Sequence, residues 1–63
     1  MTDSEVRSAR LTLGMTQREL GKWLGVTGNY IWMVEAGRKS LSPVRADLLD
    51  RMLDGYIPPW VED

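Results

Sequence analysis

Apolar residues recur every three or four positions along most of this chain, which is the spacing of one face of an α-helix. The segments Thr2–Glu5 and Thr16–Glu19 have the spacing of capping boxes, in which a threonine hydroxyl accepts a backbone N–H and the glutamate reaches back. Gly14 and Gly25 follow as stop signals, because glycine readily adopts the left-handed conformation that ends a helix. These signals predict two helices, whose inward-facing positions are Val6, Ala9, Arg10, Leu13, Leu20, Trp23 and Leu24.

Two more helices are predicted in the second half of the chain. Thr27 is a candidate N-cap for a helix that reaches Glu35, and Ser42 is a cap residue followed by a proline at the first helical position. Gly55 ends the fourth helix, and the two consecutive prolines that come soon after it exclude a helix in the remaining tail. The inward-facing positions expected in these helices are Ile31, Val34, Val44, Leu48, Leu49, Met52 and Leu53.

Length and composition narrow the functional classes. With 63 residues the chain has enough apolar surface for one small core, so we expect a single all-α domain of four or five helices at residues 1–55 and a short tail at 56–63. The chain contains no cysteine and no histidine. It therefore lacks thiolate nucleophiles, cysteine-bound zinc and the commonest general base and metal ligand. We expect no enzymatic activity, no metal site and no cofactor.

The chain also lacks the patterns of membrane and secreted proteins. Its apolar runs are far shorter than a helix that spans a bilayer. The segment Met1–Glu5 is acidic and is followed by no apolar stretch, which is unlike a signal peptide. These features predict a cytoplasmic protein with no membrane contact.

Charges are unevenly distributed, although the formal net charge is only -1. Residues 1–40 carry six basic and four acidic side chains, whereas residues 41–63 carry two basic and five acidic ones. Such segregation is typical of a protein that turns one surface toward a polyanion. An ordinary solvated surface would give the same pattern, so charge alone leaves both interpretations open.

The connection between the second and third predicted helices is informative. Only Gly25, Val26 and Thr27 separate them, and a short glycine-containing turn between two short amphipathic helices is typical of a helix-turn-helix, whose second helix enters the DNA major groove. Over roughly residues 6–53 the chain also resembles the phage repressor and Cro-type (XRE) helix-turn-helix family. The resemblance rests on Arg10, Gly14–Leu20, Leu24–Thr27, Ile31, Val34–Glu35 and Gly37–Arg38. It implies a lambda-repressor-like fold and binding to specific sequences of duplex DNA.

Several residues are candidates for contacts with DNA phosphates. Gln17 lies in the first turn of the second helix, where unpaired N–H groups and the helix dipole favour an anion, and the family anchors a phosphate with the matching glutamine. Thr27 caps the third helix and could also meet a phosphate. Arg38, Lys39 and Ser40 form a basic loop suited to the phosphate backbone. The alternative is that Gln17 and the loop are ordinary solvated surface.

The third helix carries the candidate base-reading residues. Asn29 and Met33 are expected on the side opposite the core, with Trp32 beside them. Asparagine can bind adenine through two hydrogen bonds, and Met33 or Trp32 can contact a thymine methyl group. Gly28 has no side chain and would allow the start of the helix to approach DNA closely. Alternatively, Trp32 and Met33 pack against the fourth helix or a second subunit.

Two further assignments concern the scaffold. The resemblance implies that Arg10 pairs with Glu35, whose carboxylate near the end of the third helix needs a cation because the helix dipole disfavours it. Gly21 stands where the family usually has alanine, and its small size suits a close approach of the second and third helices. We expect these residues to specify the fold without reading bases.

The tail contains the aromatic residues Tyr56 and Trp60, separated by Ile57 and two prolines. Aromatic side chains are enriched at protein interfaces, so we expect Tyr56, Ile57 and Trp60 to form a homodimer contact together with the fourth helix. The alternative is that the tail folds back over its own small core.

Together these features predict a regulator that binds specific double-stranded DNA sequences. Its simplest form is a small dimeric repressor of phage or mobile-element type on an inverted-repeat operator. The competing hypothesis is a protein-interaction module, antitoxin-like or partner-binding, that keeps the helix-turn-helix scaffold. It would bind its partner through the apolar side chains of Trp23, Trp32 and Met33.

Overall fold

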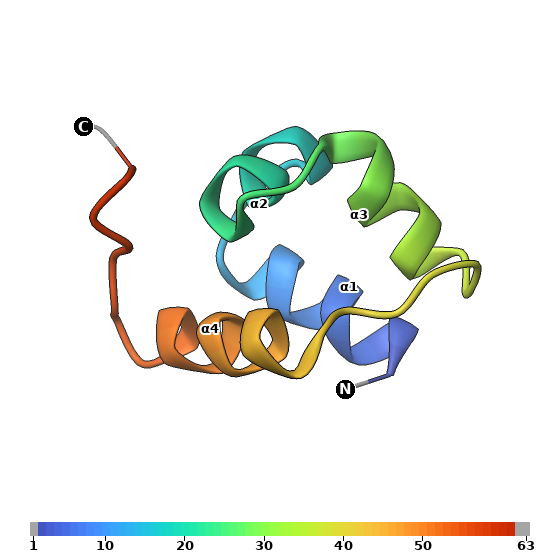
Figure 1. The fold of residues 1–63 in the computed structure, drawn as a ribbon. Helices are drawn as coiled ribbons and strands as arrows, with labels where there is room; N and C mark the ends of the chain where they lie inside the picture. Colours follow the sequence, from blue (N-terminus) through green and yellow to red (C-terminus); the bar gives the residue numbers. More distant parts are fainter. Residues whose placement is uncertain (1, 62–63) are drawn as a thin grey trace.

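Four helices and no strand are found in residues 2–61, the part of the chain that the computed structural model describes (Figure 1). The helices are α1 (Asp3–Thr12), α2 (Gln17–Leu24), α3 (Gly28–Glu35) and α4 (Pro43–Leu53). The all-α prediction is therefore confirmed, with four helices in this range. Met1, Glu62 and Asp63 lie outside the described residues; Glu62 and Asp63 are the last two positions of the predicted tail. No helix in the described range is long and apolar enough to cross a bilayer.

Side-chain hydrogen bonds define where the first two helices begin, as both capping boxes predicted. At α2 the N–H of Glu19 donates to Thr16 Oγ1 at 3.1 Å, and the N–H of Thr16 donates to Glu19 Oε1 at 2.9 Å. Thr2 and Glu5 make the same exchange at α1. Accepting the backbone N–H stabilises each carboxylate and lowers the pKa of both glutamates.

All four helices contribute to one buried apolar core. α2 and α3 approach closely where Gly21 meets the turn that precedes α3. An ideal Cβ on Gly21 would lie 2.7 Å from the carbonyl carbon of Thr27, which is closer than non-bonded atoms approach. The close packing therefore requires glycine at this position, despite its poor helix propensity. The core residues are Val6, Ala9, Leu20, Leu24, Ile31, Val34, Leu49 and Met52.

The core-facing side of α4 is narrower than the sequence pattern predicted. Leu49 and Met52 are buried and Leu48 is partly buried, but Val44 is 78% exposed and Leu53 is 40% exposed. The prediction that Val44 and Leu53 face inward is therefore wrong. Val44 lies in the first turn of α4 and Leu53 is its last residue, so both stand at the ends of the apolar stripe, where their side chains remain exposed.

The tail packs against α2. Pro58 is fully buried, and the indole N–H of Trp60 donates to the backbone carbonyl of Trp23 at 3.1 Å. Tyr56 and Ile57 remain at the surface, 42% and 61% exposed. Pro58 and Trp60 therefore fold back against the protein's own helices, as the alternative for the tail proposed. The exposed residues of the tail lie at the opposite end of the molecule from α3 and the loop that follows it (Figure 1).

Candidate functional site

An ion pair joins α1 to the last residue of α3. Arg10 Nε donates to Glu35 Oε2 at 2.6 Å and Arg10 Nη2 donates to Glu35 Oε1 at 3.0 Å, and both side chains are nearly buried. Arg10 Nη1 also donates to the backbone carbonyl of Met15 at 3.0 Å. Gln17 Nε2, at the start of α2, donates to Glu35 Oε1 at 3.3 Å. A single carboxylate therefore connects α1, α2 and α3.

Glu35 is charged in the folded protein. Burial raises the pKa of its carboxyl group. Hydrogen bonds from Arg10 and Gln17 and the charges of Arg10 and Arg7 lower the pKa by a larger amount, so it lies below its ordinary value of 4.5. The hydrogen bond to this carboxylate raises the pKa of Arg10. Arg10 compensates the charge of Glu35, so Glu35 itself adds no net negative charge near the start of α2.

The first turn of α2 offers hydrogen-bond donors at the surface. The N–H of Leu20 makes the first bond of the helix, to the carbonyl of Thr16 at 2.9 Å, and the N–H groups of Gln17 and Arg18 precede it. The amide of Gln17 keeps a second N–H and its oxygen beyond the bond to Glu35. Unpaired N–H groups at the positive end of a helix dipole form a local environment that favours an anion.

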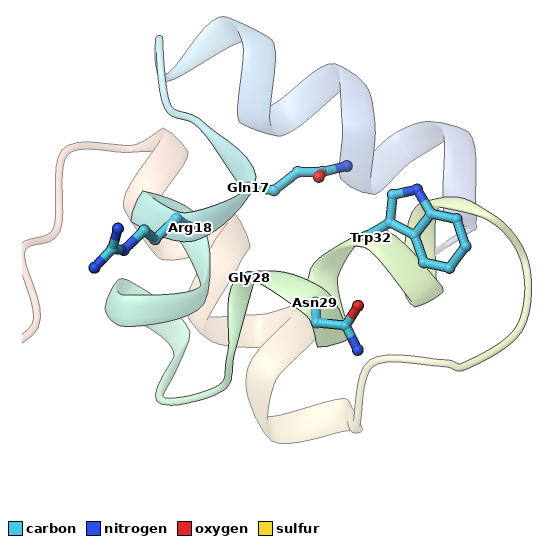
Figure 2. Close-up of a pocket in the computed structure, with 5 residues that line it drawn as sticks. All are labelled: Gln17, Arg18, Gly28, Asn29 and Trp32. Atoms are coloured by element: carbon cyan, nitrogen blue, oxygen red, sulfur yellow. The ribbon is translucent and has the colours of Figure 1, made fainter.

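An open hollow lies between α2 and α3, and Figure 2 shows the side chains that line it. They extend from both helices, with Arg18 and Trp32 on opposite sides of Gly28 and Asn29. Asn29 and Arg18 are exposed, and Trp32 is 48% exposed. The lining includes no carboxylate. It combines a guanidinium, two amides and a flat apolar ring, and consists of Gln17, Arg18, Gly28, Asn29 and Trp32.

Gly28 is at the floor of this hollow because the two helices touch there. An ideal Cβ on Gly28 would lie 2.9 Å from Arg18 Cα, so a larger residue would force α2 and α3 apart. The structure shows that Gly28 lets α3 approach α2 closely; its close approach to DNA stays a prediction. The preceding residue, Thr27, caps α3 by accepting the N–H of Tyr30 at 3.0 Å.

The loop after α3 is held beside Trp32. The N–H of Arg38 donates to the carbonyl of Met33 at 2.8 Å, and the hydroxyl of Tyr30 donates to the carbonyl of Ser40 at 2.9 Å. The guanidinium carbon of Arg38 lies 5.8 Å from the centre of the Trp32 ring, within the range of a cation–π interaction. Arg38, Lys39 and Ser40 are exposed. The loop thus continues the surface of the hollow with two cations.

The structure brings most of the predicted site residues onto one surface and adds a residue that sequence reasoning missed. Gln17, Asn29 and Trp32 line the hollow, but Met33 is only partly exposed and lies about 100° from Trp32 around the helix axis. Arg18 was not predicted to belong to the site. The signal that could have identified it is a cation in the first turn of a helix, where the dipole disfavours positive charge.

Comparisons with known proteins complete the description of this site. A family model described as a helix-turn-helix domain matches residues 4–56. The matched range contains α2, α3, α4, nearly all of α1 and every residue that lines the hollow. No curated protein and no solved structure matched the chain.

Proposed function

This chain belongs to the helix-turn-helix domain family, and from that premise we propose that it binds specific sequences of double-stranded DNA and represses transcription as a small homodimer. In such a complex α3 lies in the major groove, and the first turn of α2 meets the sugar–phosphate backbone. A dimer bound to an inverted-repeat operator excludes RNA polymerase from that site. The resemblance to phage repressors and Cro proteins favours a phage or mobile-element setting.

The observation that supports the proposal is one continuous surface that carries groups of the kinds that bind phosphates and read bases. Groups suited to phosphates lie at its two ends: N–H groups in the first turn of α2, and the cations Arg38 and Lys39 in the basic loop. Asn29 and Trp32 lie between them on α3. An exposed asparagine can bind adenine through two hydrogen bonds, and an exposed ring can contact a thymine methyl group.

Selection of duplexes from a random-sequence pool tests the proposal directly, and we expect enrichment of a defined motif. Asn29→Ala should then reduce discrimination in favour of that motif by about 1–3 kcal/mol. Affinity for unrelated DNA should stay unchanged, because it comes from phosphate contacts. Ser8→Ala, which alters an exposed polar residue of α1 outside the hollow, is the matched control. If the wild-type protein enriches no sequence, the proposal is wrong.

The proposed homodimer uses the surface formed by α4 and the tail. Val44 is 78% exposed, Ile57 is 61% exposed and Tyr56 is 42% exposed, and Leu48 and Trp60 line two adjoining hollows. Exposed apolar groups concentrated in this way are typical of interaction surfaces. A two-fold pairing of this surface would leave α3 of each copy free, with half-sites about 34 Å apart, one turn of duplex.

A point substitution tests the dimer better than removal of the tail. Deleting residues 56–63 would also remove the buried Pro58 and the bond from Trp60 to Trp23, and would disturb the fold. Ile57→Asp places a charge at an exposed position and should weaken self-association and cooperative operator binding while leaving the helical content of the folded protein unchanged. Sedimentation velocity with and without DNA measures the outcome. A wild-type protein that is monomeric under both conditions would contradict the dimer.

The second candidate is a protein-interaction module on the same scaffold. One observation favours it, since Trp32 exposes about half of a large apolar side chain on α3. A protein partner on this surface would be lost on Trp32→Ala, and binding would depend little on salt. DNA binding would instead weaken steeply as salt rises, because phosphate contacts release counterions.

A further inference from the structure

We infer that Arg18 of α2 reads a guanine in the major groove, in the place where α3 itself offers no side chain. The inference rests on the DNA binding proposed above. Arg18 would then be a base-reading residue outside α3, and guanine the base that binds at the hollow.

The position of the Arg18 side chain follows from its contact with Gly28. An ideal Cβ on Gly28 would lie 3.4 Å from Arg18 Cβ, so the side chain of Arg18 begins beside the point where a side chain at position 28 would begin. Residues at the start of a recognition helix contact base edges. Gly28 holds that place at the start of α3 without a side chain, and Arg18 is the adjacent residue that can supply one.

The charge of Arg18 also points to an external acceptor. Within residues 2–61 its guanidinium forms no ion pair, and no hydrogen bond from its side chain is found. It stands in the first turn of α2, where the helix dipole disfavours a cation. None of the residues that line the hollow is acidic. Among the described residues Arg18 is therefore a cation without a partner, at a helix end whose dipole does not stabilise it.

Guanine fits this donor set best among the four bases. Its O6 and N7 atoms are two acceptors on one edge, which match the two parallel N–H groups of a guanidinium. The guanidinium extends away from Asn29 in Figure 2. Binding a base over Gly28 therefore requires Arg18 to change its side-chain rotamers, which an exposed arginine does readily. Arg38 is differently placed, since its guanidinium lies over the ring of Trp32.

Binding-specificity profiles of the wild-type protein, Arg18→Ala and Arg18→Gln test the inference, with every base varied at every position of the selected operator. We expect a guanine in each half-site whose preference falls about ten- to one-hundred-fold in Arg18→Ala, while the other positions keep theirs. Arg18→Gln should prefer adenine at that position, because glutamine binds adenine N6 and N7. Lys22→Ala, which removes another exposed cation of α2, is the control and should leave the profile unchanged.

Two results would overturn the inference while leaving the proposed function intact. One is a uniform loss of affinity in Arg18→Ala with an unaltered profile and a salt slope reduced by about one, which is the behaviour of a phosphate contact. The other is an Arg18→Gln profile with no gain for adenine in a variant that melts like the wild type. If the wild-type protein selects no motif, the proposed function fails and the inference fails with it.

Discussion

The indole N–H of Trp60 donates a hydrogen bond of 3.1 Å to the backbone carbonyl of Trp23 and joins the tail to the last turn of α2. The next carbonyl, that of Leu24, accepts a bond of 3.0 Å from Arg45 Nε in α4. Carbonyls in the last turn of a helix have no partner within it. Two segments distant in sequence therefore complete the end of α2, just before the turn that leads to α3.

Trp60→Phe tests the contribution of this bond. The substitution keeps an aromatic ring but removes the donor, so we expect the free energy of unfolding to fall by about 0.5–1.5 kcal/mol. Thermal or urea unfolding measures the change. Tyr56→Phe is the control, because no hydrogen bond of the Tyr56 hydroxyl is found among the described residues and its loss should leave stability unchanged. Equal effects of the two substitutions would show that the bond contributes nothing.

The two ion pairs found within residues 2–61 should differ in their contributions to stability. Glu35→Gln leaves the nearly buried Arg10 without its counter-charge and should lower the free energy of unfolding by about 3 kcal/mol. Asp47→Asn breaks the exposed pair with Arg51, whose side chains are 66% and 64% exposed, and should cost less than about 1 kcal/mol. Denaturant unfolding of both variants gives the comparison, and a reversed order would contradict it.

Stability should fall in acid partly through Glu35. Its pKa is lower in the folded protein than its ordinary value of 4.5, so the folded state binds fewer protons than the unfolded chain as the pH approaches that value. The stabilisation is complete above pH 4.5 and is lost as the pH falls through the folded-state pKa. The pKa values of Glu5 and Glu19 are lowered too. Glu35→Gln should therefore reduce the loss of unfolding free energy in acid without abolishing it. Unfolding free energies that stay parallel in both proteins throughout the acid range would exclude a contribution from Glu35.

Gly21→Ala separates local propensity from tertiary packing. Alanine is the better helix former by about 1 kcal/mol, which by itself would stabilise α2. Its Cβ would lie 2.7 Å from backbone atoms of Thr27, and backbone cannot move aside as a flexible side chain does. We expect a net loss of about 1–3 kcal/mol, the usual effect of overpacking. Lys22→Ala raises propensity at the exposed neighbouring position and should be neutral or stabilising in the same thermal melts.

The basic loop can be tested through salt. Arg38→Ala should weaken binding to all DNA sequences alike and reduce the slope of log affinity against log salt by about one. Lys22→Ala removes an exposed cation of α2 that lines neither the hollow nor the proposed dimer surface, and provides the comparison for a change of net charge. A salt titration in which Arg38→Ala matches the wild type would exclude the loop from the DNA interface.

Local signals in the sequence determined the helices and the family. Thr16, Glu19 and Gly25 act within one or two turns of α2, so their spacing alone predicted its start and its end. The same holds for Thr2 and Gly14 around α1. Capping hydrogen bonds and left-handed glycines need only neighbouring residues, which is why such patterns can be read before any tertiary contact is known.

Tertiary structure decided which residues share a surface and which faces are covered. Helical spacing placed Val44 and Leu53 in the core, but burial depends on how completely the neighbouring segments cover each end of α4, and both side chains remain exposed there. Arg18 joins the hollow only because Gly28 lets α3 touch the start of α2. The hydrogen bond from Trp60 to Trp23 joins residues 37 positions apart, and the helical spacing of apolar residues cannot predict a contact at that separation. Such contacts depend on how elements distant in sequence pack in space, whereas capping and periodicity report only on neighbours within one helix.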